Sequence, residues 1–186
     1  MSDIGENMKT LIIGKYMLPD IEKPSEIDVE VDWEWIVLRE RGDRVLLISK
    51  NVVDWEFYSG LNTFCEPAKP STWEESYMRE HLAGFYDKCF TAEEKERILT
   101  NETGDHLFLL TADEAREYFP TDEQRTARIV WAEDKSQYNY CWWLNSVGES
   151  DNAMQFVDEY GKIDEVGVYN DSDEVGVRPA MWIKRV

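Results

Sequence analysis

The stretch VEVDWEWIVL at residues 29–38 decides how the fold begins. Its valines and tryptophans, including Trp33 and Trp35, alternate with acidic residues, and this two-residue period is typical of a strand with one buried face. The tripeptide RGD at 41–43 predicts a turn, and RVLLIS at 44–49 predicts a returning strand. The segment therefore predicts a β-hairpin near the start of the chain.

Outward from this hairpin, the sequence changes from strand signals to helix signals. Residues 10–18, TLIIGKYML, predict a strand before the hairpin, and the apolar run HLFLL at 106–110 predicts a short buried strand. Between and after these strands, a threonine followed three residues later by a glutamate predicts the start of a helix, because the two side chains satisfy each other's free backbone amides. The pattern occurs three times, at Thr72 and Glu75, Thr91 and Glu94, and Thr111 and Glu114.

The last third of the chain returns to strand signals. We expect strands in CWWLNS (141–146), in 153–169 on both sides of a turn at Tyr160 and Gly161, and in VGVRPAMWI (175–183). Because strands and helices do not alternate regularly, the order predicts an α+β fold rather than a parallel α/β sheet. The length predicts one domain over residues 1–186, with residues 1–8 as a flexible leader.

Charge and cysteine content limit the classes of partner and compartment. The formal net charge of -19 repels nucleic acid, and it fits solubility, a cationic partner or a carboxylate site for a divalent cation. Three cysteines, at Cys65, Cys89 and Cys141, cannot all pair within the chain, which indicates a reducing compartment. No secretion signal and no membrane-spanning run is present, so the expected location is the cytoplasm, with no membrane partner.

Several segments in order resemble a widespread uncharacterised bacterial family. The resemblance rests on WEWIVL, LLISK, TWEESYMREHL, FTAEEKERI, LFLLTADEA, WWLNSVG and GVRPAMW, which span residues 33 to 182. It implies a C-type-lectin-like fold: a twisted antiparallel sheet with two or more short helices and a loop-rich lobe, in which the first and last strands pair. Distant similarity to the formylglycine-generating enzymes is also implied. Where the family has Arg and Pro, this sequence has Asn145 and Val147.

The residues for catalysis or for a metal are incomplete. A copper-dependent oxidase of the formylglycine-generating kind needs paired thiols, and the three cysteines lie far apart in the sequence. His81 is expected to pack within a helix, and His106 to open a strand. Calcium ligands of the C-type-lectin kind are not intact, although the acidic stretches at 151–152 and 171–174 could supply oxygen atoms. We therefore expect no cofactor, with calcium as the alternative.

The sequence favours a non-catalytic binding module over an enzyme or an assembly scaffold. Trp142, Trp143, Asn145 and Arg178 come from segments that the implied fold places side by side. Aromatic faces beside polar groups suit a small molecule, a carbohydrate or a protein. The competing interpretation is structural: one of the two tryptophans faces the core, and Arg178 pairs with a carboxylate such as Glu75.

Overall fold

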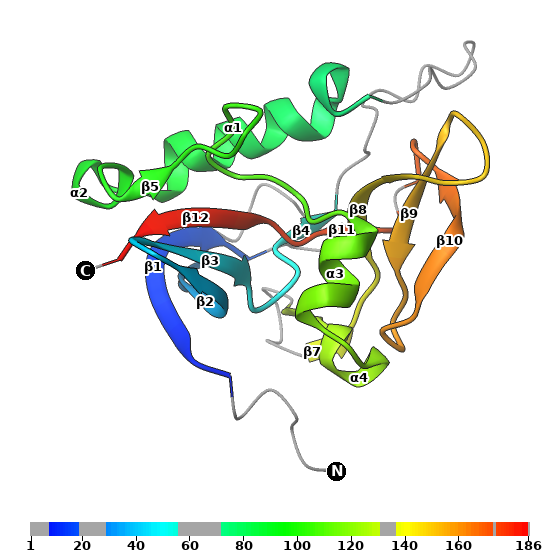
Figure 1. Cartoon of the computed structure of the whole chain (residues 1–186), viewed down its shortest axis with the longest axis horizontal. Helices are drawn as coiled ribbons and strands as arrows, with labels where there is room; N and C mark the ends of the chain where they lie inside the picture. Colours follow the sequence, from blue (N-terminus) through cyan, green and yellow to red (C-terminus); the bar gives the residue numbers. More distant parts are fainter. Residues whose placement is uncertain (1–7, 19–28, 56–71, 131–136, 173, 186) are drawn as a thin grey trace.

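The computed structural model describes residues 8–18, 29–55, 72–130, 137–172 and 174–185. In this part of the chain, two five-stranded sheets, one two-stranded sheet and a few short helices pack together (Figure 1). Almost all neighbouring strands are antiparallel. The fold is therefore α+β, as the order of strand and helix signals predicts.

The first sheet contains the predicted hairpin. Its strands lie in the order β1 (Thr10–Met17), β2 (Glu30–Arg41), β3 (Arg44–Ser49), β12 (Ala180–Lys184) and β5 (Ile98–Leu99). Gly42, at a φ of 62°, lets a two-residue turn join β2 to β3. The implied pairing of the first and last strands is wrong in detail, because β12 pairs with β3 while β1 pairs with β2.

The late tryptophan-rich strand lies in a second sheet. The order there is β10 (Ile163–Tyr169), β9 (Ala153–Val157), β8 (Trp142–Val147), β11 (Gly176–Val177) and β4 (Asp54–Trp55). A smaller sheet pairs β6 (Arg128–Val130) with β7 (Gln137–Asn139). The chain passes from the second sheet to the first between β11 and β12, at Arg178 and Pro179. Proline has no amide to donate to a ladder, so the pairing changes there.

Two of the three predicted helix starts are confirmed. Capping boxes at Thr91 and Thr111 begin α2 (Ala92–Lys95) and α3 (Ala112–Tyr118). The box predicted at Thr72 is wrong: a 3-10 turn, η2 (Trp73–Glu75), follows it without a side-chain cap.

The longest helix, α1 (Tyr77–Cys89), instead begins after Ser76, whose hydroxyl accepts a hydrogen bond from the Arg79 amide at 3.2 Å. A fourth helix, α4 (Asp122–Arg125), also has a capping box, at Thr121 and Gln124. Sequence reasoning missed this helix, although the letters TDEQ carry the same signal.

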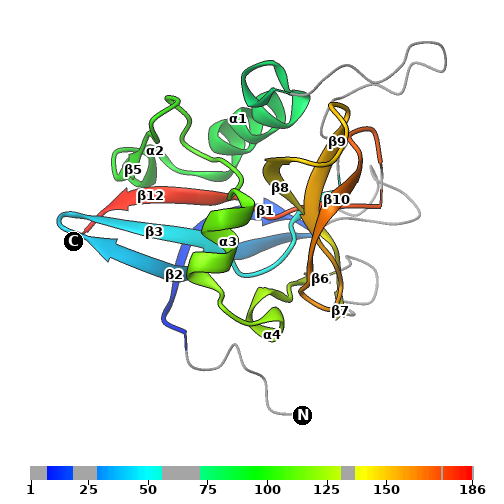
Figure 2. The ribbon, with the colours of Figure 1, turned by 45° about the vertical axis from the view of Figure 1, so that its right-hand side comes forward.

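Helices α1 and α3 lie on opposite sides of the first sheet (Figure 2). On the α1 side, Trp33 is fully buried, and its ring centroid lies 4.6 Å from that of Trp35 and 5.6 Å from that of Phe90. On the α3 side, Arg39 of β2 forms an ion pair with Glu117 at 2.8 Å. The strand predicted at 106–110 does not form a strand: residues 107–110 are buried, and Phe108 makes an isolated bridge with Ala180.

Of the flexible leader predicted at residues 1–8, only Met8 is among the described residues. Residues 1–7 lie outside the described residues, but Met8 is half-buried and packs against the core. No helix among the described residues is long and apolar enough to cross a membrane.

Candidate functional site

The two predicted tryptophans are both buried. Trp142 and Trp143 are 0% exposed, so the expectation that only one of them faces the core is wrong. The reason is the position of β8, which has β9 on one side and β11 on the other and is covered on both faces. The Trp142 indole donates a hydrogen bond to the Arg125 carbonyl at 3.1 Å. Neither ring presents a face to solvent.

Arg178 holds parts of both sheets together from the interior. Its guanidinium donates to the carbonyl oxygens of Ser49 at 2.9 Å and Arg125 at 3.1 Å, and only 1% of the residue is exposed. The cation lies 4.9 Å from the Trp142 ring centroid and 5.3 Å from that of Phe119. The predicted ion pair with Glu75 is therefore wrong. Burial lowers the pKa of Arg178 to about 9.

Of the four predicted residues, Asn145 alone is half-buried. The backbone amide of Asn145 donates a hydrogen bond to the Leu110 carbonyl at 2.8 Å, which fixes the backbone of β8. Ligand binding by the four residues stays a prediction. Their observed contacts stiffen the second sheet and join it to the first.

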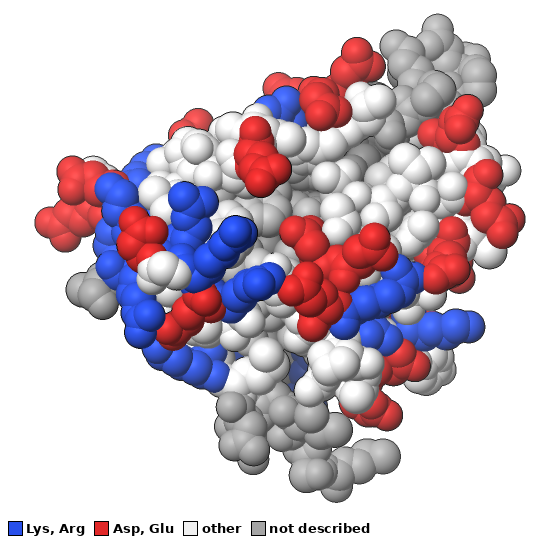
Figure 3. Space-filling view, viewed as in Figure 1, with Lys and Arg blue, Asp and Glu red and all other residues white. Residues whose placement is uncertain are grey.

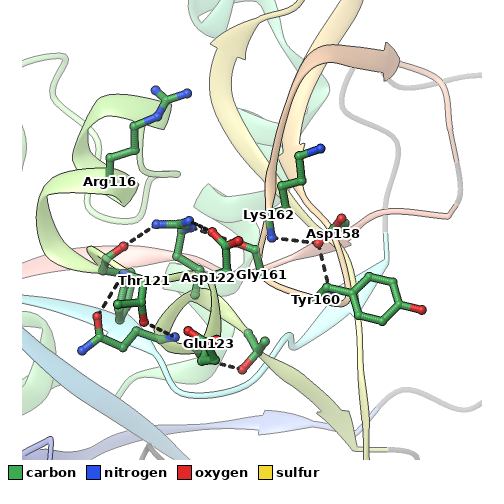
Figure 4. Close-up of polar contacts among 12 residues, drawn as sticks. Arg116, Thr121, Asp122, Glu123, Asp158, Tyr160, Gly161 and Lys162 are labelled. Carbon is green, nitrogen blue, oxygen red and sulfur yellow. Dashed lines mark hydrogen bonds and ion pairs between the residues drawn. The ribbon is translucent and has the colours of Figure 1, made fainter.

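The turn between β9 and β10 docks rigidly on α4. Arg125 donates to the Gly161 carbonyl at 2.8 Å and forms an ion pair with Asp122 (Figure 4). A side chain at Gly161 would collide with the Asp122 carbonyl, at 1.7 Å from its Cβ. The Asp158 carboxylate accepts hydrogen bonds from the amides of Tyr160 and Lys162, at 3.0 and 2.8 Å. These contacts fix the turn that carries Tyr160, a residue that is 74% exposed.

More exposed apolar side chains lie along the same sheet. Beyond Tyr160, they are Tyr169 at 62%, Val166 at 55% and Val147 at 49%. Sequence reasoning named the turn at 160–161 but did not assign these side chains to a site. The available signal was an aromatic residue inside an acidic turn, DEYG at 158–161.

A family model for a domain of unknown function, DUF6273, matches residues 42–185. The chain belongs to the DUF6273 family. The match begins in the β2–β3 turn, so β1 and β2 precede it although they complete the first sheet. Searches of curated proteins and of solved structures found no match.

Two thiols of the DUF6273 domain are poor nucleophiles. Cys89 and Cys141 are free, and burial raises the pKa of each thiol to about 11. For Cys141, the neighbouring Glu159 carboxylate raises the pKa further. Because the thiolate is the reactive form, neither cysteine is activated near neutral pH. Cys65, the third cysteine, lies outside the described residues.

The two histidines of the DUF6273 domain pack against aromatic rings. His81 lies at 3.2 Å from an Asp54 carboxylate oxygen and meets Phe85 edge-on at 4.9 Å between ring centroids. In the described part of the chain, no hydroxyl or thiol forms a hydrogen bond with His81. His106 stacks on Tyr86 at 3.9 Å. These contacts match the expected packing role of His81 and contain no nucleophile for a His-Asp pair.

The described residues of the DUF6273 domain hold no group of three or more potential metal ligands close enough to share an ion. The acidic loops considered for calcium are partly engaged within the protein: Ser150 donates to Asn152 at 3.0 Å. Calcium binding therefore stays a sequence hypothesis without an assigned ligand set.

Proposed function

We propose that this domain is a non-catalytic module that binds a basic segment of another protein on the β9–β10 side of the second sheet. The observation that carries the proposal is the combination of exposed aromatic side chains with an excess of carboxylates. Between residues 147 and 172 the sequence has seven carboxylates and one lysine. Tyr160 and Tyr169 are exposed within this segment. A surface of one charge sign steers a partner of the opposite sign.

The tyrosines give the surface more than charge. Lysine and arginine side chains bind over aromatic faces, and tyrosine also offers a hydroxyl at low cost in side-chain entropy. Tyr160 is presented by a turn that Arg125 and Asp158 already fix, so little conformational entropy is lost when a partner binds. These features favour a basic segment with apolar residues over a purely cationic one.

The backbone of β10 favours side-chain contacts over the addition of a new strand. Within the described residues β10 pairs with β9 alone, so its other edge lies at the end of the sheet. A bulge interrupts the β9–β10 ladder, with Gly167 at a φ of 78° and its amide bonded to the Asp164 carboxylate at 2.9 Å. A bulge of this kind twists an edge and limits continuous pairing.

We further infer a C-type-lectin-like fold for the domain. Support comes from the N-terminal and C-terminal strands within one sheet, the long helix α1 beside it, and a second sheet rich in loops. In this scheme Trp142, Trp143 and Arg178 form the rigid support of the binding lobe, and Asn145 lies at its margin. Free thiols at Cys89 and Cys141 suit a reducing cytoplasm.

Binding of a synthetic peptide of alternating lysine and leucine tests this function. We expect the double variant Tyr160→Ala, Tyr169→Ala to bind about tenfold more weakly by fluorescence anisotropy, because two aromatic contacts are lost. The control is Tyr77→Ala, which removes a 39% exposed tyrosine from α1. Equal weakening in both proteins, or no binding by the unaltered domain, contradicts the proposal.

A further inference from the structure

Three cations stand directly opposite one another across the first sheet. Arg41 of β2 pairs with Arg44 of β3, and Arg44 pairs with Lys184 of β12. Residues paired across antiparallel strands project from the same face. All three are exposed, so a row of positive charge crosses the end of the sheet at about 4.8 Å per strand.

The row continues toward a fourth cation and includes an aromatic ring. The Lys184 amide donates to the carbonyl of Arg97 at 2.8 Å, which places the Arg97 backbone next in line. The Arg97 Nε atom is buried and has no hydrogen-bond partner. Trp182, two residues before Lys184 in β12, projects from the same face and is half-buried.

Two glutamates near this row, Glu40 and Glu117, pair with other cations. Glu40 projects from the other face, where it forms ion pairs with Lys9 at 3.5 Å and Arg185 at 3.1 Å. Glu117 forms its ion pair with Arg39.

Within the described residues, no carboxylate lies within ion-pair distance of Arg41, Arg44 or Lys184. Burial acts to raise the pKa of Glu94, but hydrogen bonds from Thr91 and Gly14 outweigh it, and the charge of Arg97 lowers that pKa further.

Such a row is unexpected in a chain of net charge -19. Like charges directly opposite one another on a sheet are destabilising. Carboxylates are abundant elsewhere on the surface, yet Lys and Arg gather over the end of β2, β3 and β12, while Asp and Glu dominate the centre and right of the same view (Figure 3). A bound anion would relieve the repulsion between the cations.

We propose that Arg41, Arg44 and Lys184 form a binding site for a small ligand with two or more adjacent phosphate groups. Guanidinium groups bind phosphate oxygens through two parallel hydrogen bonds, and lysine adds a point charge. The row spans only about 10 Å of backbone, which matches a compact anion. A long polyanion would continue onto the acidic surface and be repelled. Trp182 provides an aromatic surface beside the phosphates, suited to the base of a nucleotide.

Inorganic triphosphate is the first probe, measured by thermal unfolding and by calorimetry against sodium chloride of equal ionic strength. At about one hundred times the Kd, we expect triphosphate to raise Tm by about 5 °C or more. Adenosine triphosphate should bind more tightly than triphosphate if Trp182 stacks on the base. Equal shifts with sodium chloride would show general screening only and would overturn the site.

The variant Arg44→Gln removes the centre of the row. We expect it to raise the Tm of the free protein, because two like-charge contacts disappear, and to weaken triphosphate binding at least tenfold. Lys184→Gln should also raise the Tm of the free protein and weaken triphosphate binding. It replaces Arg44→Gln in the test if that variant fails to fold. Lys15→Gln is the matched control, since it also removes one positive charge, but from β1, where Lys15 forms an ion pair with Glu30.

Three results contradict the site: no binding of triphosphate, binding unchanged in Arg44→Gln and Lys184→Gln, or equal loss in Lys15→Gln. Binding of an acidic peptide with no response to triphosphate would assign the row to a protein partner instead. Self-association that salt disperses, again without a triphosphate response, would assign it to the acidic surface of a second copy. Both results overturn the phosphate ligand and leave the proposed basic-segment site on the second sheet untouched.

Discussion

The two large sheets of this domain are built and charged in opposite ways. The first grows from a local hairpin whose buried face contains Trp33 and Trp35, and its end exposes a row of cations. The second combines β4, β8 and β11, which are far apart in the sequence, and its exposed side is acidic and aromatic. A single net charge therefore hides two surfaces with different chemistry. We propose a different class of ligand for each surface.

The connection between the sheets is polar, although each interior is apolar. Arg178 donates to Ser49 at the end of β3 and to Arg125 at the end of α4, and it packs on Trp142 of β8. A buried guanidinium costs desolvation, which the lowered pKa reflects. In return, the guanidinium of Arg178 donates hydrogen bonds to two buried carbonyl groups, which a hydrocarbon side chain could not do.

The largest expected effect comes from removing the start of the first sheet. A fragment of residues 42–185, the stretch that the family model matches, lacks β1 and β2. It exposes the apolar face of β3, so we expect no cooperative unfolding transition in urea.

The point substitution Trp33→Ala should destabilise the full chain by about 3–5 kcal/mol, while Trp33→Phe should cost less because it keeps a ring. Urea denaturation followed by near-UV circular dichroism measures both. A cooperative transition for the fragment, with the midpoint of the full chain, would show that the second sheet stands without the first.

The next effect concerns the connection itself. Replacing Arg178 by alanine leaves the Ser49 and Arg125 carbonyls without its donors and opens a cavity against Trp142. We expect a loss of about 2–4 kcal/mol in the free energy of unfolding, and Arg178→Met should recover the packing part alone. A loss below about 0.5 kcal/mol for alanine would refute the role of Arg178 as the connection.

A smaller, pH-dependent effect belongs to the loop that supports α1. Burial acts to raise the pKa of Asp105, but hydrogen bonds from Thr103, Trp73 and Arg79 outweigh it, so the pKa lies below its ordinary 3.8. The ionised carboxylate stabilises the folded chain fully above that ordinary value. This stability is lost as the pH falls through the lower folded pKa.

We expect Asp105→Asn to cost about 1–2 kcal/mol at pH 7. The difference from the unaltered protein should shrink as the pH falls below about 4. Urea denaturation across this pH range measures it, with Asp113→Asn as the control, since Asp113 is an almost fully exposed partner of Arg116. A difference that does not change with pH would contradict the hydrogen-bonded carboxylate as its source.

The local parts of the fold were predictable because their causes are local. The alternation around Trp33 and the turn at Gly42 predict the β2–β3 hairpin, and the capping boxes at Thr91 and Thr111 predict helix starts. At Thr72 the same rule failed, because Ser76 competes for the role and caps the longer helix. The four-residue capping pattern cannot tell which of two neighbouring candidate residues, Thr72 or Ser76, caps the helix.

The candidate site was less predictable, since burial depends on what lies across the sheet. Trp142 and Trp143 look like a ligand platform in the sequence, yet a central strand covered on both faces buries both rings. Conversely, Arg41, Arg44 and Lys184 look like scattered charges. They form a row because register pairs β2 with β3, and β3 with the last strand.

By itself, the sequence determined the acidic balance, the opening hairpin, the starts of α2 and α3 and the α+β class, because periodicity and capping act over a few neighbouring residues. Only the tertiary structure decided that Arg178 serves both sheets, that the two tryptophans are buried, and that cations and tyrosines gather on separate surfaces. The physical reason is strand order. Pairing brings residues more than one hundred positions apart into contact, and no short-range pattern records that choice.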